Sequence, residues 1–253
     1  MEKRLNKVVT DGDYSLLYPE EAKTIAVHWH GYKYVTNDHT DGGALKHHND
    51  YLAAVKMLCP NKEWVNGLDW CSGDGGLGMM FLGEKLVKHM TFMDRYDPAI
   101  KGCKFNITYN KIENLTEVVK ADKISDIKGK YDFVIGNAPS QRLCSLTRMY
   151  KLGWLSSKKD SPMTLEEAIA DREQKNPHRA IDWNWETHKE FFANIHEKLN
   201  PGADVFLFEN PNDFNPLFWE WGETKLKLIQ WVDHNQIPEL NKHPQVILHF
   251  RYE

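Results

Sequence analysis

The stretch from Val65 to Gly78 (VNGLDWCSGDGGLG) has the residue types and spacing to hold a nucleotide-like cofactor. A short apolar segment ends on the acid Asp69, and a glycine-rich turn follows before an apolar run with helical character. Glycine lets the backbone take a positive φ and approach a ligand closely, and a helix start offers free N–H groups with partial positive charge. The stretch therefore predicts a strand, a glycine loop and a helix that bind a cofactor.

The same loop matches a dinucleotide-binding pattern. Residues 73–78 read Gly-Asp-Gly-Gly-Leu-Gly, which fits the GxGxxG fingerprint. Asp94 ends the next expected strand, where dinucleotide-binding folds carry a ribose-binding acid. A nicotinamide-dependent oxidoreductase is therefore one interpretation of these residues.

The elements that must position the loop alternate between strand and helix from Glu63 onward. Five strands are expected at Trp64–Asp69, His89–Asp94, Glu117–Ala121, Tyr131–Gly136 and Ala203–Glu209. Helices are expected at Asp50–Leu58, Leu77–Lys88, Pro98–Asn110 and Trp185–Leu199. Two last strands, Leu226–Val232 and Val246–Arg251, have no long helix between them, which is typical of an antiparallel hairpin. The pattern predicts an α/β fold with a seven-stranded, mostly parallel sheet, a terminal antiparallel hairpin and helices on both faces.

Composition limits the class of protein. The chain has 253 residues, 41% of them hydrophobic, and a formal net charge of -4, so it can bury a substantial core and has no basic surplus. No apolar run approaches the ~20 residues that span a bilayer, and the N-terminus has no signal-peptide pattern. The four cysteines are scattered without a CxxC pair, which favours a reducing, cytoplasmic environment.

Further polar residues follow the expected strands. Asp69 precedes Gly73 by four residues, Asp122 ends the third strand, and the fourth strand runs into Asn137-Ala138-Pro139-Ser140. With the glycine loop, these residues resemble the class I S-adenosylmethionine-dependent methyltransferases. The closest resemblance is to the subset that methylates planar nitrogens, namely protein-glutamine, N6-adenine and guanine N2 methyltransferases. Its motif is Asn/Asp-Pro-Pro-aromatic. The resemblance covers residues 63–140, and 185–253 in outline, and it implies a Rossmann-like fold.

The resemblance also implies S-adenosyl-L-methionine as the cofactor and no metal. Asp69 would face the amino end of the cofactor, Asp94 would accept from both ribose hydroxyls, and Asp122 would accept from the adenine amino group. The implied cofactor-binding residues are Asp69, Cys71, Gly73, Gly75, Gly78, Asp94, Arg95, Asp122, Lys123 and Asn137.

Asn137 is the main catalytic candidate, together with Ala138 and Pro139. The Asn137 side-chain oxygen and the Ala138 carbonyl would accept hydrogen bonds from the acceptor nitrogen, so catalysis would consist of positioning and electrostatics. Ala138 replaces the first proline of the family motif, and Ser140 replaces the aromatic residue that stacks on a flat acceptor. Candidate substrate contacts are Ser140, Tyr150, Trp154 and Asn210, the last within the segment Glu209-Asn210-Pro211 that follows the fifth strand.

Several alternatives stay open. The acceptor is a protein glutamine, a nucleobase or a small molecule, and methylation at oxygen or carbon of a small metabolite is the second interpretation. A third is a cofactor-binding partner subunit without catalysis. Basic residues between 142 and 159 are interleaved with Tyr150 and Trp154, so a nucleic acid acceptor is a less favoured option.

The chain is expected to divide into an N-terminal cap segment, residues 1–60, and a methyltransferase domain, residues 61–253. An insert at about 141–185 would lie on the substrate side of this domain. The N-terminal part is rich in histidine, and strand alternation would place His28 and His30 on one face. No recognisable metal-ligand set accompanies them, so a segment that covers the cofactor or acceptor pocket is preferred to a metal site.

Overall fold

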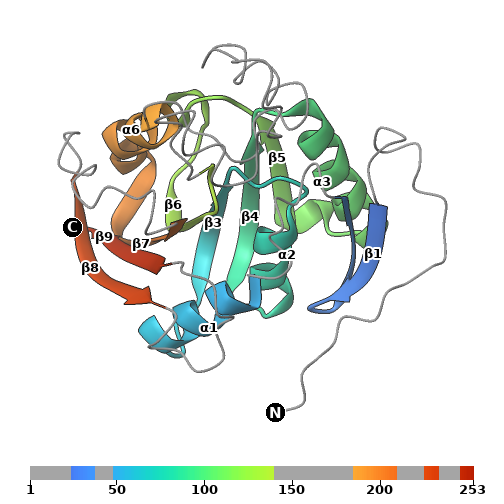
Figure 1. The fold of residues 1–253 in the computed structure, drawn as a ribbon, viewed down its shortest axis with the longest axis horizontal. Helices are drawn as coiled ribbons and strands as arrows, with labels where there is room; N and C mark the ends of the chain where they lie inside the picture. The colour runs from blue at the N-terminus through green and yellow to red at the C-terminus, as the bar shows by residue number, and fades with distance from the viewer. Residues whose placement is uncertain (1–23, 38–47, 140–184, 210–224, 234–245) are drawn as a thin grey trace, which may run out of the picture.

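The computed structural model describes residues 24–37, 48–139, 185–209, 225–233 and 246–253, and its main feature is one seven-stranded sheet (Figure 1). The strand order is β5-β4-β3-β6-β7-β9-β8. The bounds are β3 Trp64–Trp70, β4 Val87–Asp94, β5 Thr116–Lys120, β6 Tyr131–Gly136, β7 Leu199–Glu209, β8 Leu226–Asp233 and β9 Val246–Tyr252. Strands β3 to β7 pair in parallel, and β9 is antiparallel to both of its neighbours. The predicted α/β, Rossmann-like sheet with an antiparallel end is confirmed.

Helices cover both faces of the sheet. Helices α1 (His48–Leu58), α2 (Gly76–Gly83) and α3 (Asp97–Asn110) contribute side chains to the core on one face, and α6 (Glu186–Asn194) contributes to the core on the other (Figure 1). Short 3-10 turns lie at Glu113–Leu115 (η3), Ile124–Asp126 (η4) and Ile195–Lys198 (η6). Among the described residues, no helix is long and apolar enough to cross a membrane.

Alternation along the central strands divides the core into two layers. On β6, Phe133 and Ile135 belong to the layer beneath α1 and α2, whereas Val134 between them belongs to the layer beneath α6. All three side chains are fully buried, as expected for a strand covered on both faces.

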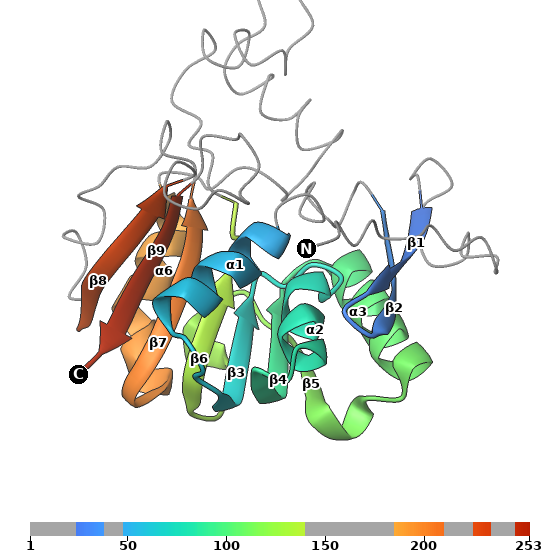
Figure 2. The ribbon, with the colours of Figure 1, turned by 90° about the horizontal axis from the view of Figure 1, so that it is seen from below.

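The order of the strands reverses at β3. Strands β4 and β5 follow on one side of it, and β6 and β7 lie on the other, with the parallel strands pointing to the same edge (Figure 2). Open α/β sheets bind ligands outside the carboxyl ends of their strands at such a reversal. The fold therefore directs attention to the segments that follow β3, β4 and β6.

A two-stranded hairpin, β1 (Thr24–Trp29) and β2 (Tyr32–Asn37), lies apart from the main sheet. Its turn residues His30 and Gly31 have φ of 44° and 89°, the combination that a two-residue type I′ turn requires. The expectation that His28 and His30 share a strand face was wrong, because His30 lies in this turn. There its Nδ1 forms a hydrogen bond with Glu84 Oε1 at 2.7 Å.

The hairpin is attached to α3 by two side-chain amides. Asn106 accepts from the Val35 amide N–H at 2.8 Å and donates to the Val35 carbonyl at 2.9 Å. Asn110, one helical turn later, binds the N–H and C=O of Lys33 in the same way, at 2.8 and 2.7 Å. The two amides thus act as a substitute strand for the edge of β2.

Two predicted helix ends differ from the structure. Helix α2 ends at Gly83 and not at Lys88, because Lys85 takes a left-handed φ of 59° and the Leu86 amide donates back to the Phe81 carbonyl at 3.0 Å, after which β4 begins at Val87. The helix expected to reach Leu199 ends at Asn194 and continues as a 3-10 turn, so β7 begins at Leu199. Residues 140–184 lie outside the described residues, so the domain division and the insert stay predictions.

We expect Asn106→Ala to lower the free energy of unfolding by about 2 kcal/mol or more, because it leaves buried backbone groups of β2 without partners. Chemical denaturation measures the change. Asn114→Ala is the matched control, since Asn114 is exposed in η3. Equal stability of the two variants would contradict the role given to Asn106.

Candidate functional site

The glycine loop between β3 and α2 turns through three left-handed residues. Cys71, Gly73 and Gly75 have φ of 56°, 54° and 85°, and Gly75 is the N-cap of α2. Gly78 has a different role: a Cβ there would lie 2.5 Å from the Phe92 ring and 2.9 Å from Asp69 Oδ2. The loop conformation therefore depends on Gly73 and Gly75, and the packing of α2 on the sheet depends on Gly78.

Asp69 lies beneath the first turn of α2 with only 1% of its surface exposed. Its Oδ2 accepts a hydrogen bond from the Gly78 amide at 2.8 Å. The pKa of Asp69 is raised to about 8, chiefly by burial; the Gly78 amide opposes the rise and the Asp94 carboxylate adds to it. A positive charge brought to this carboxylate would stabilise its ionised form.

Asp94 ties the loop to the next helix. Its Oδ2 accepts from the Gly73 amide at 2.8 Å, and its Oδ1 accepts from the Tyr96 amide, just before α3, at 2.9 Å. Burial raises the pKa of Asp94, and the backbone amides of Tyr96 and Gly73 oppose the rise. Each carboxylate oxygen retains a lone pair for a second donor, so both amide contacts are compatible with two hydroxyl donors from a ligand.

Asp122, Arg95 and Lys123 lie at the outer part of the same edge. The Arg95 guanidinium approaches Asp122 Oδ1 at 3.2 Å, and both side chains are largely exposed. A pair of this kind has little effect on stability. The pair follows β4 and β5 at the same edge as Asp94.

Asn137, Ala138 and Pro139 follow β6 directly. Asn137 is half-buried, Ala138 is buried, and the Asn137 amide has no hydrogen-bond partner among the described residues. The preceding carbonyl, of Gly136, accepts a hydrogen bond from the buried Tyr51 hydroxyl of α1. The register pairs Gly136 with Trp70, the last residues of β6 and β3, so Asn137 follows β6 where the glycine loop follows β3.

The structure thus brings together most of the residues predicted from the sequence. The residues that end β3, β4, β5 and β6 gather at one edge of the sheet, with Asp69 and Asp94 coupled through the loop. The predicted substrate contacts Ser140, Tyr150, Trp154 and Asn210 lie outside the described residues.

Three residues of this edge were missed from the sequence: Tyr51, Ser72 and His188. Ser72 Oγ is buried in the glycine loop without a hydrogen-bond partner in the described structure. His188, in the first turn of α6, binds Glu209 at the end of β7 through Nε2 and Oε1, 2.9 Å apart. The segment Glu209-Asn210-Pro211 was a candidate because it follows a strand, but no local pattern marks the histidine that binds Glu209 from 21 residues earlier.

These groups fit S-adenosylmethionine. Its ammonium group is a cation that would stabilise the buried Asp69 carboxylate, and its ribose carries two hydroxyl donors for Asp94. The unpartnered Ser72 hydroxyl offers a further hydrogen bond to a ligand in the loop. The start of α2 and its left-handed loop provide the close backbone approach.

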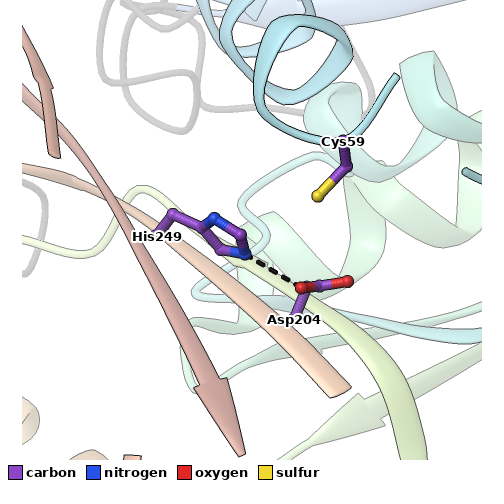
Figure 3. Close-up of side chains that lie close together, drawn as sticks. All are labelled: Cys59, Asp204 and His249. Carbon is purple, nitrogen blue, oxygen red and sulfur yellow. Dashed lines mark hydrogen bonds and ion pairs between the residues drawn. The ribbon is translucent and has the colours of Figure 1, made fainter. Parts of the chain in front are cut away.

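A second cluster has the residue types of a metal centre. Cys59, Asp204 and His249 converge toward the opposite edge of the sheet, near the start of β3, and their ligand atoms lie within 4.8 Å of one another (Figure 3). Asp204 already accepts from His249 at 2.9 Å, from Trp64 at 3.0 Å, from Arg251 and from Lys62.

Those contacts are incompatible with an additional cation. Burial alone would raise the pKa of Asp204, but the hydrogen bonds from His249, Lys62, Arg251 and Trp64 hold it well below its usual value. Burial raises the pKa of the Cys59 thiol, whereas metal ligation needs the thiolate. A metal would have to displace Lys62 and Arg251, so we assign the cluster to fold stability.

We expect the free energy of unfolding to fall between about pH 4 and pH 8, because Asp69 keeps its proton in the folded protein and loses it when unfolded. In Asp69→Asn, the free energy of unfolding should fall less over this pH range, by an amount on the order of a few kcal/mol. Denaturation at pH 5 and pH 8 measures it, with Glu113→Gln, an exposed acid, as control. An unchanged pH dependence in Asp69→Asn would rule out the raised pKa.

Comparisons with known proteins agree with this geometry. Residues 53–148 match the family model described as methyltransferase small domain. No curated protein matches the sequence significantly.

Solved structures share the fold at low sequence identity. SMU.776, a candidate methyltransferase complexed with SAH (S-adenosylhomocysteine), superposes with a TM-score of 0.55 at 10% identity, over 92% of this chain and 56% of that one. TrmN from Thermus thermophilus gives 0.52 at 11% identity, over 90% and 56%. aTrm5, solved with tRNALeu, gives 0.52 at 14%, over 92% and 54%. The chain spans little more than half the length of these three structures.

The family match favours the methyltransferase interpretation over the nicotinamide one and implies S-adenosylmethionine as the cofactor. In part of its sequence and in its described fold, the chain is similar to S-adenosylmethionine-dependent methyltransferases.

Proposed function

We propose that this protein transfers a methyl group from S-adenosylmethionine to a nitrogen, which Asn137 and the Ala138 carbonyl orient. The observation that carries the proposal is the position of Asn137: its amide has no partner among the described residues and follows β6, beside the loop that Asp69 and Asp94 anchor. The partial resemblance to the Asn/Asp-Pro-Pro-aromatic motif supports the choice of nitrogen.

Each residue then has a defined task. Asp94 would accept from the ribose hydroxyls, Asp122 from the adenine amino group, and Asp69 would face the amino end of the cofactor. Gly73 and Gly75 would allow the loop to approach the ligand. The bound cofactor supplies a methyl group on a positively charged sulfur.

The acceptor side depends on hydrogen-bond acceptors. A planar nitrogen is a weak nucleophile while its lone pair is delocalised. Two oxygens that accept its N–H hydrogens would fix its orientation and favour the positive charge that develops on it. Tyr51 would hold this segment in place, since its hydroxyl binds the Gly136 carbonyl from α1.

The acceptor molecule is not fixed by these groups alone. TrmN and aTrm5 are structural neighbours, and aTrm5 was solved with tRNALeu, which supports RNA as one acceptor class to be screened. Salt distinguishes the classes, because binding to RNA should weaken steeply as salt rises. Free nucleosides and glutamine peptides should bind with little dependence on salt.

We expect calorimetric titration to show micromolar binding of SAH and no binding of NADH. Asp94→Asn should weaken SAH binding at least about tenfold, as expected for loss of a charge-assisted hydrogen bond. Asp97→Asn is the matched control, an exposed acid three residues further on that pairs with Lys120. Binding of NADH in place of SAH would overturn the proposed cofactor.

We expect Asn137→Ala to lower methyl transfer by about 100-fold or more while SAH affinity changes little, because one oriented hydrogen-bond acceptor is lost. Transfer of labelled methyl groups to the acceptor found by screening measures this effect. Asn137→Asp, which keeps a side-chain oxygen, should retain more turnover than the alanine variant. Unchanged turnover in Asn137→Ala would remove Asn137 from the mechanism.

A further inference from the structure

His188 of α6 and Glu209 at the end of β7 form a buried polar pair. Both side chains are buried, with 0% and 1% of their surfaces exposed. Oε1 of Glu209 binds His188 Nε2 at 2.9 Å, but Oε2 is buried without a hydrogen-bond partner in the described structure. A buried carboxylate oxygen without a partner is costly, so its retention needs an explanation such as a ligand.

The position of Glu209 connects it with the residues already proposed to hold the acceptor. The parallel register pairs Gly136 of β6 with Leu207 of β7. Glu209 ends β7 two residues after Leu207, and Ala138 follows two residues after Gly136, just past the end of β6, so both lie at the carboxyl ends of neighbouring strands. Ala138 belongs to the core layer of α6, on the side from which His188 approaches.

Neighbouring aromatic rings fix the pair. The His188 ring lies edge-on to Trp70, the last residue of β3, at 5.4 Å, and edge-on to Trp185 at 5.0 Å. Trp70 also stacks on Phe191 of α6 at 4.1 Å. His188 is thus held by rings, and through its hydrogen bond it orients Glu209.

We propose that Glu209, oriented by His188, joins Asn137 and the Ala138 carbonyl in selecting a planar acceptor that carries an NH2 group and a second N–H on the same carbon. This inference rests on the proposed function and adds the chemical pattern of the acceptor. Three oxygens that only accept hydrogen bonds complement three N–H donors on one edge. An ionised carboxylate has no donor of its own.

The pattern separates acceptors that the Asn137 segment alone would not distinguish. The edge of guanine and the guanidinium group both present NH2 beside N–H. Adenine presents NH2 beside a ring nitrogen that accepts, and a glutamine amide presents NH2 beside a carbonyl. In these two acceptors, the lone pair of the ring nitrogen or of the carbonyl oxygen would face the Glu209 carboxylate, and the two would repel each other.

The test uses the whole protein saturated with SAH and four small probes. Guanosine and N-acetylargininamide carry the donor–donor pattern, and adenosine and N-acetylglutaminamide carry the donor–acceptor pattern. Calorimetry or NMR titration should show at least tenfold tighter binding of one or both donor–donor probes. The stronger of the two identifies a base or a guanidinium as the acceptor.

Glu209→Gln gives the decisive comparison. Its amide oxygen can still accept from His188, and its NH2 would then replace Oε2, so the preference should shift toward the donor–acceptor probes. Glu84→Gln is the matched control, since Glu84 also pairs with a histidine, His30, but lies after α2. It should leave the preference unchanged, and SAH affinity should be retained in both variants.

The outcomes distinguish failure of the proposed function from failure of the role of Glu209. Failure of the wild-type protein to bind SAH would overturn the proposed function. Binding of SAH with no binding of any probe, with no preference among the probes, or with the same preference in Glu209→Gln would overturn the role of Glu209 alone. The last result would mean that Oε2 is satisfied by an internal water.

Discussion

The hydrogen bond from the Gly78 amide to the buried Asp69 carboxylate is the contact on which the candidate cofactor site depends. It joins the end of β3 to the first turn of α2, across a loop that turns through left-handed residues. The contact tolerates no side chain at position 78, because a Cβ would meet both Asp69 and Phe92. A carboxylate kept in so dry a position favours a neutral form or a cationic neighbour, and a cationic cofactor supplies the second.

The N-terminal hairpin holds the same loop, from the N-terminal side of the sequence, through two side-chain hydrogen bonds. Thr36 of β2 donates to Asp74 of the loop at 2.7 Å, and Trp29 of β1 donates to the Gly76 carbonyl at 2.8 Å. A short edge strand would leave its own backbone groups unpaired, but Asn106 and Asn110 of α3 bind them. The hairpin, the loop and α3 are therefore one hydrogen-bonded unit, and a disturbance of any member reaches the cofactor loop.

Sequence periodicity predicted the sheet well, because the strands are buried on both faces and end in recognisable polar residues. Asp94 and Asn137 could be located for that reason. The end of α2 could not be predicted because the left-handed residue that follows the helix is Lys85 and not the glycine or asparagine that usually marks such an end. The roles of Asn106 and of His188 were also hidden, because their partners lie 71 and 21 residues away and no local spacing reports such contacts.

The two edges of the sheet differ in how completely their buried polar side chains are hydrogen-bonded. Near the start of β3, Asp204 is as buried as Asp69, yet four side chains satisfy it and its pKa is held low. At the carboxyl edge, Ser72 Oγ and Glu209 Oε2 are buried without partners, and burial raises the pKa of both Asp69 and Asp94. A carboxylate whose oxygens are all hydrogen-bonded within the protein has no free lone pair for a ligand. Buried polar groups without partners are stabilised when a ligand supplies the missing hydrogen bonds. Burial of polar groups alone therefore does not identify a site; at the carboxyl edge it is combined with incomplete hydrogen bonding of Ser72 and Glu209 among the described residues.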